Sequence, residues 1–516
     1  MDFLLRNDTQ FNGTLSSETY FELVTDGDFV GKFAAFYITL LATCIFSQRL
    51  SKCPEYLRET VLLTFVNLTA ILLLPDVAWA IEKPFQCTNF TSLYILEGIC
   101  NVEDIQRRIE TQLLDKRDDK GALVYERLKY SVVERFGFYC WEKCEKFQVT
   151  NHVRLMDEDR KEYTENEVFE GLSAIADIPM SCDKPQWEIL IVPKFVYLND
   201  ETRTGNYYGI IFRVHHSIMD GVSAGNALKY ALADKPMKFS VDPLKGPKIH
   251  PVLLFLLHLK AYTIATSRLF KAMSIRDKNC FNHDLLTGPK YFGWSKPVCM
   301  NAVKKIREHF KSTTTSVFMN SLGGAVRHLA IKKNLPVPSR IYATPTIAML
   351  PYPDTKPTNR FIIVHYPMEI GLPSRLERLR SANESAKKLA GSMDPLVFFL
   401  MLKLGGRFPV IMAKHILGQL DATMILSNVP GPSEDAYLFG GHKLVDSVFW
   451  VPLKNWSGIG AGLFSYAGKV RASFVGDGVA LPDSTDVNEL LRGFENEISE
   501  MGKLAGLGPE EVFWKD

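Results

Sequence analysis

The stretch YYGIIFRVHHSIMDGVSAGNALKY, residues 207–230, decides how the chain is organised. Its apolar first part, residues 207–214, predicts a buried strand, and the turn that follows leads into a predicted helix. Side chains of a strand point alternately to opposite faces, so His216 and His215 point in opposite directions. The two histidines therefore cannot perform the same task.

The end of this strand offers a candidate catalytic group. An imidazole is mostly neutral at pH 7 and accepts a proton from a nearby hydroxyl, which makes His216 a candidate general base. Asp220 is expected to orient the turn, and Gly221 to let the chain bend sharply into the helix. The same residues also fit a hairpin end with a buried, hydrogen-bonded histidine pair. A metal is not expected, because adjacent histidines on a strand diverge whereas zinc ligands share a face.

The pattern His-His-x-x-x-Asp-Gly at residues 215–221 resembles the signature of the coenzyme A-dependent acyltransferase superfamily. Within it, the chain is most similar to the wax ester synthase/diacylglycerol acyltransferase family. Further stretches resemble the family in the same order: residues 151–154, 185–188, 286–289 and 427–432. The resemblance covers roughly residues 95–505.

This resemblance implies an α/β fold of two chloramphenicol acetyltransferase-like domains with the active site at their interface. It implies a catalytic motif with His216 as general base, accompanied by His215, Asp220 and Gly221. Five further positions are implied to bind substrate: Ser427, Asn428, Thr315, Ser316 and Asn359. The sequence departs from the family pattern where Thr315-Ser316 replaces an Asn-Asp pair, and where Thr358 replaces the glycine of a Gly-Asn segment.

The implied activity is transfer of a long-chain acyl group from acyl-coenzyme A to a fatty alcohol or diacylglycerol. The product is a wax ester or a triacylglycerol, formed by direct attack, with acyl-coenzyme A as co-substrate and no bound cofactor. Two alternatives stay open: a short-chain or soluble substrate, and a non-catalytic lipid-binding protein on the same scaffold. A formal net charge of +2 gives no sign of a nucleic-acid surface, and the 9 cysteines do not form a disulfide framework.

The N-terminal region predicts membrane attachment. Residues 1–28 are polar and acidic and are expected to form a lumenal tail, and residues 29–90 are expected to form a membrane anchor. Within the anchor, Phe29–Phe46 fits a transmembrane helix or, alternatively, a buried core helix. Basic residues that follow it indicate the cytosolic side. The shorter apolar run Val61–Leu74 is typical of a re-entrant or interfacial segment, so one crossing is favoured over two.

Beyond the anchor, three segments are expected: an N-terminal acyltransferase half at 91–234, a crossover at 235–285 and a C-terminal half at 286–516. Within the crossover, residues 252–270 fit either a helix lying on a membrane surface or a helix buried against the second half. We expect an endoplasmic reticulum membrane protein whose catalytic part faces the cytosol.

Overall fold

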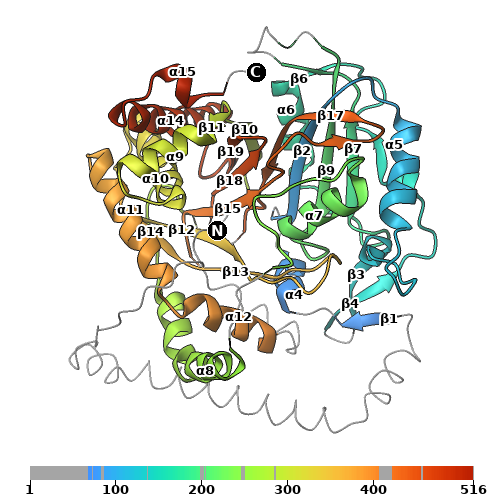
Figure 1. The fold of residues 1–516 in the computed structure, drawn as a ribbon, viewed down its shortest axis with the longest axis horizontal. Coiled ribbons are helices and arrows are strands. Elements are labelled where there is room, and N and C mark those ends of the chain that lie inside the picture. The colour runs from blue at the N-terminus through green and yellow to red at the C-terminus, as the bar shows by residue number, and fades with distance from the viewer. Residues whose placement is uncertain are drawn as a thin grey trace.

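The computed structural model describes residues 68–71, 74–82, 86–135, 138–197, 203, 205–245, 250–283, 286–405, 421–454 and 457–514. The predicted lumenal tail and the predicted transmembrane helix lie outside these residues. Two α/β halves stand side by side, with the N-terminal half in blue to green and the C-terminal half in yellow to red (Figure 1). Helices α8 and α12 lie below them (Figure 1).

The N-terminal half is built on a six-stranded sheet with the order β16-β17-β2-β9-β7-β5. Its apolar strand β9, Tyr207–His215, is almost wholly buried, which confirms the predicted strand, and it runs antiparallel to β2 and β7. Helix α6 packs on one face of this sheet, and α5 and α7 pack on the other. The elements of this half are β2 Asn89–Glu97, α5 Val102–Arg108, β3 Tyr130–Arg135, β4 Phe138–Lys143, β5 Val153–Leu155, β6 Tyr163–Thr164, α6 Glu165–Ala176, β7 Trp187–Val192, β8 Phe195–Val196 and α7 Gly221–Ala227.

The C-terminal half is built on a second, eight-stranded sheet whose main path is β10-β19-β18-β15-β12-β13. Strands β18 and β19 form a hairpin that turns at Ala467 and Gly468, both of which have positive φ. The last long helix, α14, buries an apolar stripe from Val487 to Met501. The elements of this half are β10 Lys290–Trp294, β11 Val298–Cys299, α9 Met300–His309, α10 Thr314–Lys332, β12 Ile341–Ala348, β13 Phe361–Ile363, β14 Tyr366–Met368, α11 Arg375–Ala390, α12 Asp394–Gly405, β15 Met424–Pro430, β18 Ile459–Tyr466, β19 Lys469–Asp477, α14 Ser484–Leu504 and α15 Pro509–Val512. Two strands from the same part of the chain, β16 Tyr437–Leu438 and β17 His442–Trp450, belong to the sheet of the N-terminal half.

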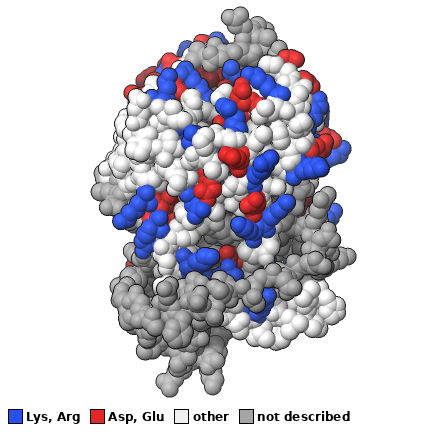
Figure 2. All heavy atoms as spheres, turned by 90° about the vertical axis from the view of Figure 1, so that its left-hand side faces the viewer, with Lys and Arg blue, Asp and Glu red and all other residues white. Residues whose placement is uncertain are grey.

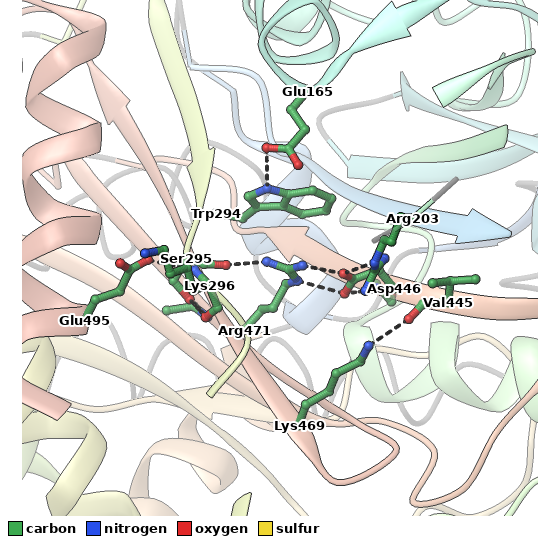
Figure 3. Close-up of polar contacts among 12 residues, drawn as sticks. Glu165, Arg203, Trp294, Ser295, Lys296, Val445, Asp446, Lys469, Arg471 and Glu495 are labelled. Carbon is green, nitrogen blue, oxygen red and sulfur yellow. Dashed lines mark hydrogen bonds and ion pairs between the residues drawn. The ribbon is translucent and has the colours of Figure 1, made fainter. Parts of the chain in front are cut away.

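Strand β17 joins the two halves. It follows β15 in the chain, but it pairs with β2 in the sheet of the N-terminal half. A buried ion pair continues the junction, because Asp446 of β17 accepts hydrogen bonds from Arg471 of β19 in the other sheet (Figure 3). The two sheets are thereby held together, and a site between them is built from both halves.

The expected membrane anchor is wrong in its last part. Strand β1, Leu68–Ile71, pairs antiparallel with β4, and helix α4, Leu74–Ala80, follows it into the folded body. Asp76 of α4 is buried and forms an ion pair with Arg127 of the N-terminal half. A paired strand and a buried ion pair belong to the protein interior rather than to an interfacial segment, so the described residues from 68 to 90 are part of the catalytic body.

The crossover contains one long helix, α8, Pro251–Ser274. It begins with a proline at its first position, where the missing N–H costs no helical hydrogen bond. Ala261 and Ala265 pack against Val397 and Leu400 of α12. Among the described residues, α8 is the one helix long and apolar enough to cross a membrane, judged by length and composition alone.

Candidate active site

The junction of β9 and α7 places the two histidines in different environments. His216 directly follows the end of β9 and lines an open cavity between the two halves. His215 points away from this cavity and is fully hydrogen-bonded. Its Nε2 lies 3.0 Å from Oγ1 of Thr88, and its Nδ1 lies 2.6 Å from Oγ of Ser217. His216 is therefore the histidine available to a substrate.

Aromatic rings surround the His216 imidazole. The indole of Trp79 stacks on it with ring centroids 4.1 Å apart, and the rings of Phe90 and Phe361 lie at 5.3 Å and 5.4 Å. Burial among these rings disfavours the charged imidazolium and lowers the pKa of His216 to about 3. The imidazole is consequently neutral at pH 7.

The amide of Asn359 fixes which imidazole nitrogen carries the proton. Its Nδ2 donates to the carbonyl oxygen of His216 at 2.7 Å and to Oδ1 of Asp76 at 2.9 Å. Its Oδ1 therefore faces Nδ1 of His216, 3.1 Å away, and can only accept a hydrogen bond there. Nδ1 carries the hydrogen, and Nε2 keeps the lone pair that a general base requires.

Asp220 joins the turn to the other half of the molecule. Its Oδ1 accepts from the backbone N–H of Ser223 and caps α7, at 2.8 Å. Its Oδ2 accepts from the hydroxyl of Tyr352 at 2.7 Å and from the backbone N–H of Arg360 at 2.8 Å. All three bonds use the carboxylate as an acceptor, so Asp220 holds the turn in place at the wall of the cavity.

Gly221 is needed for a reason that differs from the expected one. Its backbone lies outside the left-handed region, so the turn does not demand a glycine for its dihedral angles. Instead, a Cβ atom at this position would lie 3.2 Å from Cγ2 of Val429 on β15. The glycine allows the two halves to approach closely beside the cavity.

The residues expected to bind substrate fall into three places. Ser427 and Asn428 line the cavity, and Ser427 accepts a hydrogen bond from Thr346 at 3.1 Å. Thr315 and Ser316 do not line it: they lie at the start of α10, where the hydroxyl of Ser316 donates to Asn383. Asn359 acts on His216 instead of lining the cavity.

Three residues of the site were not predicted: Asp76, Trp79 and Arg127. Arg127 pairs with Asp76, Asp76 accepts from Asn359, and Trp79 covers one face of the imidazole. The available signal was a proline, an aspartate and a tryptophan directly after an apolar run, which was interpreted as a membrane segment.

The lining of the cavity is mainly apolar, with a few hydroxyl and amide groups. The apolar part includes Phe90, Val222, Phe239, Phe361, Phe449 and Phe464. No group of three or more His, Cys, Asp or Glu side chains that could hold a metal occurs in the described part of the chain. Such a lining favours a hydrophobic substrate that lies beside the neutral imidazole of His216.

Comparisons with known proteins agree with this geometry. The model of the wax ester synthase/diacylglycerol acyltransferase catalytic domain matches residues 106–249, and that of the WS/DGAT C-terminal domain matches residues 358–502, together more than half of the chain. A Mycobacterium tuberculosis protein named as a diacylglycerol O-acyltransferase is 23% identical over 406 residues, 72% of this chain and 78% of that protein.

Two solved structures have the same fold. The wax ester synthase/diacylglycerol acyltransferase of Marinobacter aquaeolei VT8 superposes with a TM-score of 0.58 at 19% identity, over 85% of this chain and 100% of that one. The starter condensation domain of rhizomide synthetase, solved with C8-CoA, gives a TM-score of 0.52 at 10% identity, over 88% and 97%. The α/β fold is thus that of two-domain acyltransferases and condensation domains, as the sequence resemblance implied. The chain belongs to the wax ester synthase/diacylglycerol acyltransferase family and is an O-acyltransferase of that type.

Proposed function

We propose that the protein transfers a long-chain acyl group from acyl-coenzyme A to the hydroxyl of a fatty alcohol or diacylglycerol. The observation that carries this proposal is the neutral imidazole of His216, whose Nε2 is left with its lone pair at the wall of a mainly apolar cavity. Such a cavity suits an acyl chain and a water-insoluble alcohol. The product is a wax ester or a triacylglycerol.

In the proposed reaction, Nε2 of His216 takes the proton of the acceptor hydroxyl. At the same time, the hydroxyl oxygen attacks the carbonyl carbon of the thioester. The tetrahedral intermediate collapses as the carbon–sulfur bond breaks, and the proton on Nε2 passes to the departing thiolate to give free coenzyme A. Thr346 donates to Ser427, so the hydroxyl hydrogen of Ser427 is free to face the oxyanion. General-base catalysis of this kind contributes about 10²- to 10⁴-fold.

An assay with labelled substrates tests this function. Membranes containing the protein are incubated with labelled long-chain acyl-coenzyme A and either a fatty alcohol or a diacylglycerol, and the ester is identified by mass spectrometry. His216→Ala should abolish transfer while the variant remains folded. Ester formation at the normal rate by the purified variant would remove the base assignment, and formation of esters from short-chain donors alone would favour a different substrate.

Membrane attachment belongs to the same proposal. The predicted transmembrane helix at 29–46 stays a prediction that places the catalytic halves on the cytosolic side of the endoplasmic reticulum, where acyl-coenzyme A is met. Glycosylation at Asn383 of α11 would contradict this orientation, because N-linked sugars are added in the lumen. Solubilised microsomes are treated with and without a glycosidase, and the mobility of the protein in electrophoresis shows whether it carries such a sugar.

A further inference from the structure

Helix α8 exposes a continuous apolar surface at the edge of the molecule. Its first turns carry large side chains with high exposed fractions, for example 65% for Phe255, 52% for Leu256 and 53% for Leu259. Only 11% of its most apolar window is buried, whereas a core helix of the same composition would be mostly buried. Figure 2 shows a mostly white patch at the lower edge of the described surface, at the height of α8, whereas charged side chains of both signs are scattered over the face above it.

The fold excludes a crossing by this helix. A crossing would place residues 86–245 and residues 286–514 on opposite sides of a bilayer. Strand β17 of the second part pairs with β2 of the first, from Leu444 opposite Leu96 to Trp450 opposite Thr91. Strands that share a hydrogen-bonded ladder must lie on the same side, so α8 lies along any bilayer that it meets.

The charges of α8 suit an anionic surface. The helix contains no Asp or Glu, and after its apolar first turns it carries Lys260, Lys271 and Arg268, of which Arg268 forms an ion pair with Asp394 of α12. Lys271 is exposed, as are Arg276 and Lys278 directly after the helix. An apolar face beside basic residues is the composition of helices that bind in the interface of membranes with acidic lipids.

We propose that α8 docks the enzyme on the surface of a phospholipid bilayer, with its first turns in the acyl boundary and its basic end against acidic headgroups. Helix α12 connects this surface to the active site. It packs on α8, and its Phe399 packs against Ile362 and Val364 beside Phe361, which lines the cavity. This arrangement would deliver a lipid acceptor from the bilayer to His216, an inference that rests on the proposed function.

Photo-crosslinking tests the docking without relying on activity. The full chain carries p-benzoyl-L-phenylalanine in place of Phe255 and is mixed with radiolabelled phosphatidylcholine vesicles, with and without phosphatidylserine. The control places the same probe at Ile331, a residue of α10 that is 54% exposed. Lipid labelling at position 255, increased by phosphatidylserine and absent at 331, is expected. Equal labelling at both positions, or crosslinks from 255 to a second copy of the protein, would overturn the proposal.

A kinetic comparison separates docking from chemistry. The variant Phe255→Ser/Leu256→Ser should lower the rate with diacylglycerol in vesicles by at least about tenfold, since each apolar side chain removed weakens membrane partitioning. It should leave the rate with water-soluble short-chain substrates unchanged, and Ile99→Ser, which alters an apolar residue that is 76% exposed elsewhere, should change neither rate. If the protein with the probe at position 255 crosslinks to lipid but the unmodified protein forms no ester, the docking surface is supported and the proposed function is disproved. Equal losses on both substrates would disprove the docking role.

Discussion

His216 and Asn359 form a reciprocal pair: the imidazole Nδ1 donates to the amide oxygen over 3.1 Å, and the amide nitrogen donates to the carbonyl of His216 over 2.7 Å. The two residues come from different halves of the molecule. The pair thus couples the orientation of the base to the correct docking of the halves, and it determines which nitrogen is free to act.

Replacement of Asn359 should impair catalysis through His216. In Asn359→Ala, Nδ1 loses its acceptor and the carboxylate of Asp76 loses a donor, so the imidazole is no longer held in one tautomer. We expect kcat to fall about 10²-fold, within the range of general-base contributions. Steady-state kinetics with short-chain substrates measures the loss.

A double variant separates positioning from a general structural effect. If Asn359 acts through the imidazole, Asn359→Ala should cost little further activity in a His216→Ala background, because residues that act as a unit are non-additive. Independent, additive losses in the double variant would show that Asn359 has another role.

The pH dependence of the reaction should reflect the buried imidazole. The pKa of His216 is lowered to about 3 by burial, so its basic form predominates at any higher pH. We expect kcat/KM to stay level from pH 7 to about pH 5, where an ordinary histidine with a pKa of about 6.5 would lose most of its basic form. Stability, unlike activity, should depend on pH in this range. Below about pH 6.5 the unfolded chain takes up a proton on His216 and the folded chain does not, so the free energy of unfolding decreases as the pH is lowered toward about 3.

Trp79 tests the cause of this shift. In Trp79→Ala, water reaches the face of the imidazole that the indole covered, and the pKa of His216 should rise toward its ordinary value. The acid limb of the pH profile should then appear between about pH 5 and pH 7. Trp514→Ala, which removes a tryptophan that packs beside Gly468 and does not line the cavity, serves as the control. An unchanged pH profile in Trp79→Ala would show that burial by the indole does not cause the lowered pKa of His216.

The sequence predicted what is local and missed what folding brings together. The strand, the diverging histidines and the capped turn were readable because their residues lie within a few positions of one another. Asp76 and Asn359 are separated by 283 positions, and only the folded chain brings them within hydrogen-bonding distance. An apolar run before a proline has the same appearance whether it enters a membrane or, as here, ends in a strand and a buried helix.

The resemblance to a family also had a limit that the structure explains. Thr315 and Ser316 were assigned to substrate binding because relatives carry polar residues at this place. The first turn of α10 uses Ser316 differently, since Ser316 donates its backbone N–H to Thr313 and its hydroxyl to Asn383 of α11. The motif therefore predicted the correct helix, α10, but did not predict what Ser316 in its first turn contacts.

Loss of Asp220 should destabilise the fold more than it alters the chemistry. Asp220→Ala removes the side-chain cap of α7 and the carboxylate that accepts from the hydroxyl of Tyr352 and from the backbone N–H of Arg360, and we expect about 3 kcal/mol of stability to be lost. Tyr352→Phe keeps the cap and the bond from Arg360, and it should cost about 1 kcal/mol. Denaturant unfolding monitored by circular dichroism measures both. Unchanged stability of Asp220→Ala would contradict the structural role.

The ion pair between Asp446 and Arg471 should contribute to holding the two sheets together. Both groups are buried, and attraction by the guanidinium lowers the pKa of Asp446 although burial alone would raise it (Figure 3). Asp446→Ala leaves a buried cation uncompensated, which costs about 3 to 5 kcal/mol. The exposed pair of Glu500 and Lys503 is the matched control, and Glu500→Gln should change stability by less than about 1 kcal/mol. Similar unfolding curves for the two variants would disprove the proposed contribution.

Ser427 should matter for the rate where Ser316 does not. The hydroxyl of Ser427 lines the cavity and already accepts from Thr346, so its own hydrogen is available to an oxyanion formed beside His216. Removing one such donor typically costs about 10²- to 10³-fold in kcat, and Ser427→Ala should approach the lower end, because Asn428 lies beside it in the same cavity. Ser316→Ala removes a hydroxyl that bonds Asn383 away from the cavity and should leave kcat within about twofold of the unmodified protein while lowering its stability by about 1 kcal/mol. Single-turnover measurements with a short-chain acyl-coenzyme A distinguish the two variants. An equal loss of rate in Ser316→Ala and Ser427→Ala would show that the first turn of α10 takes part in catalysis.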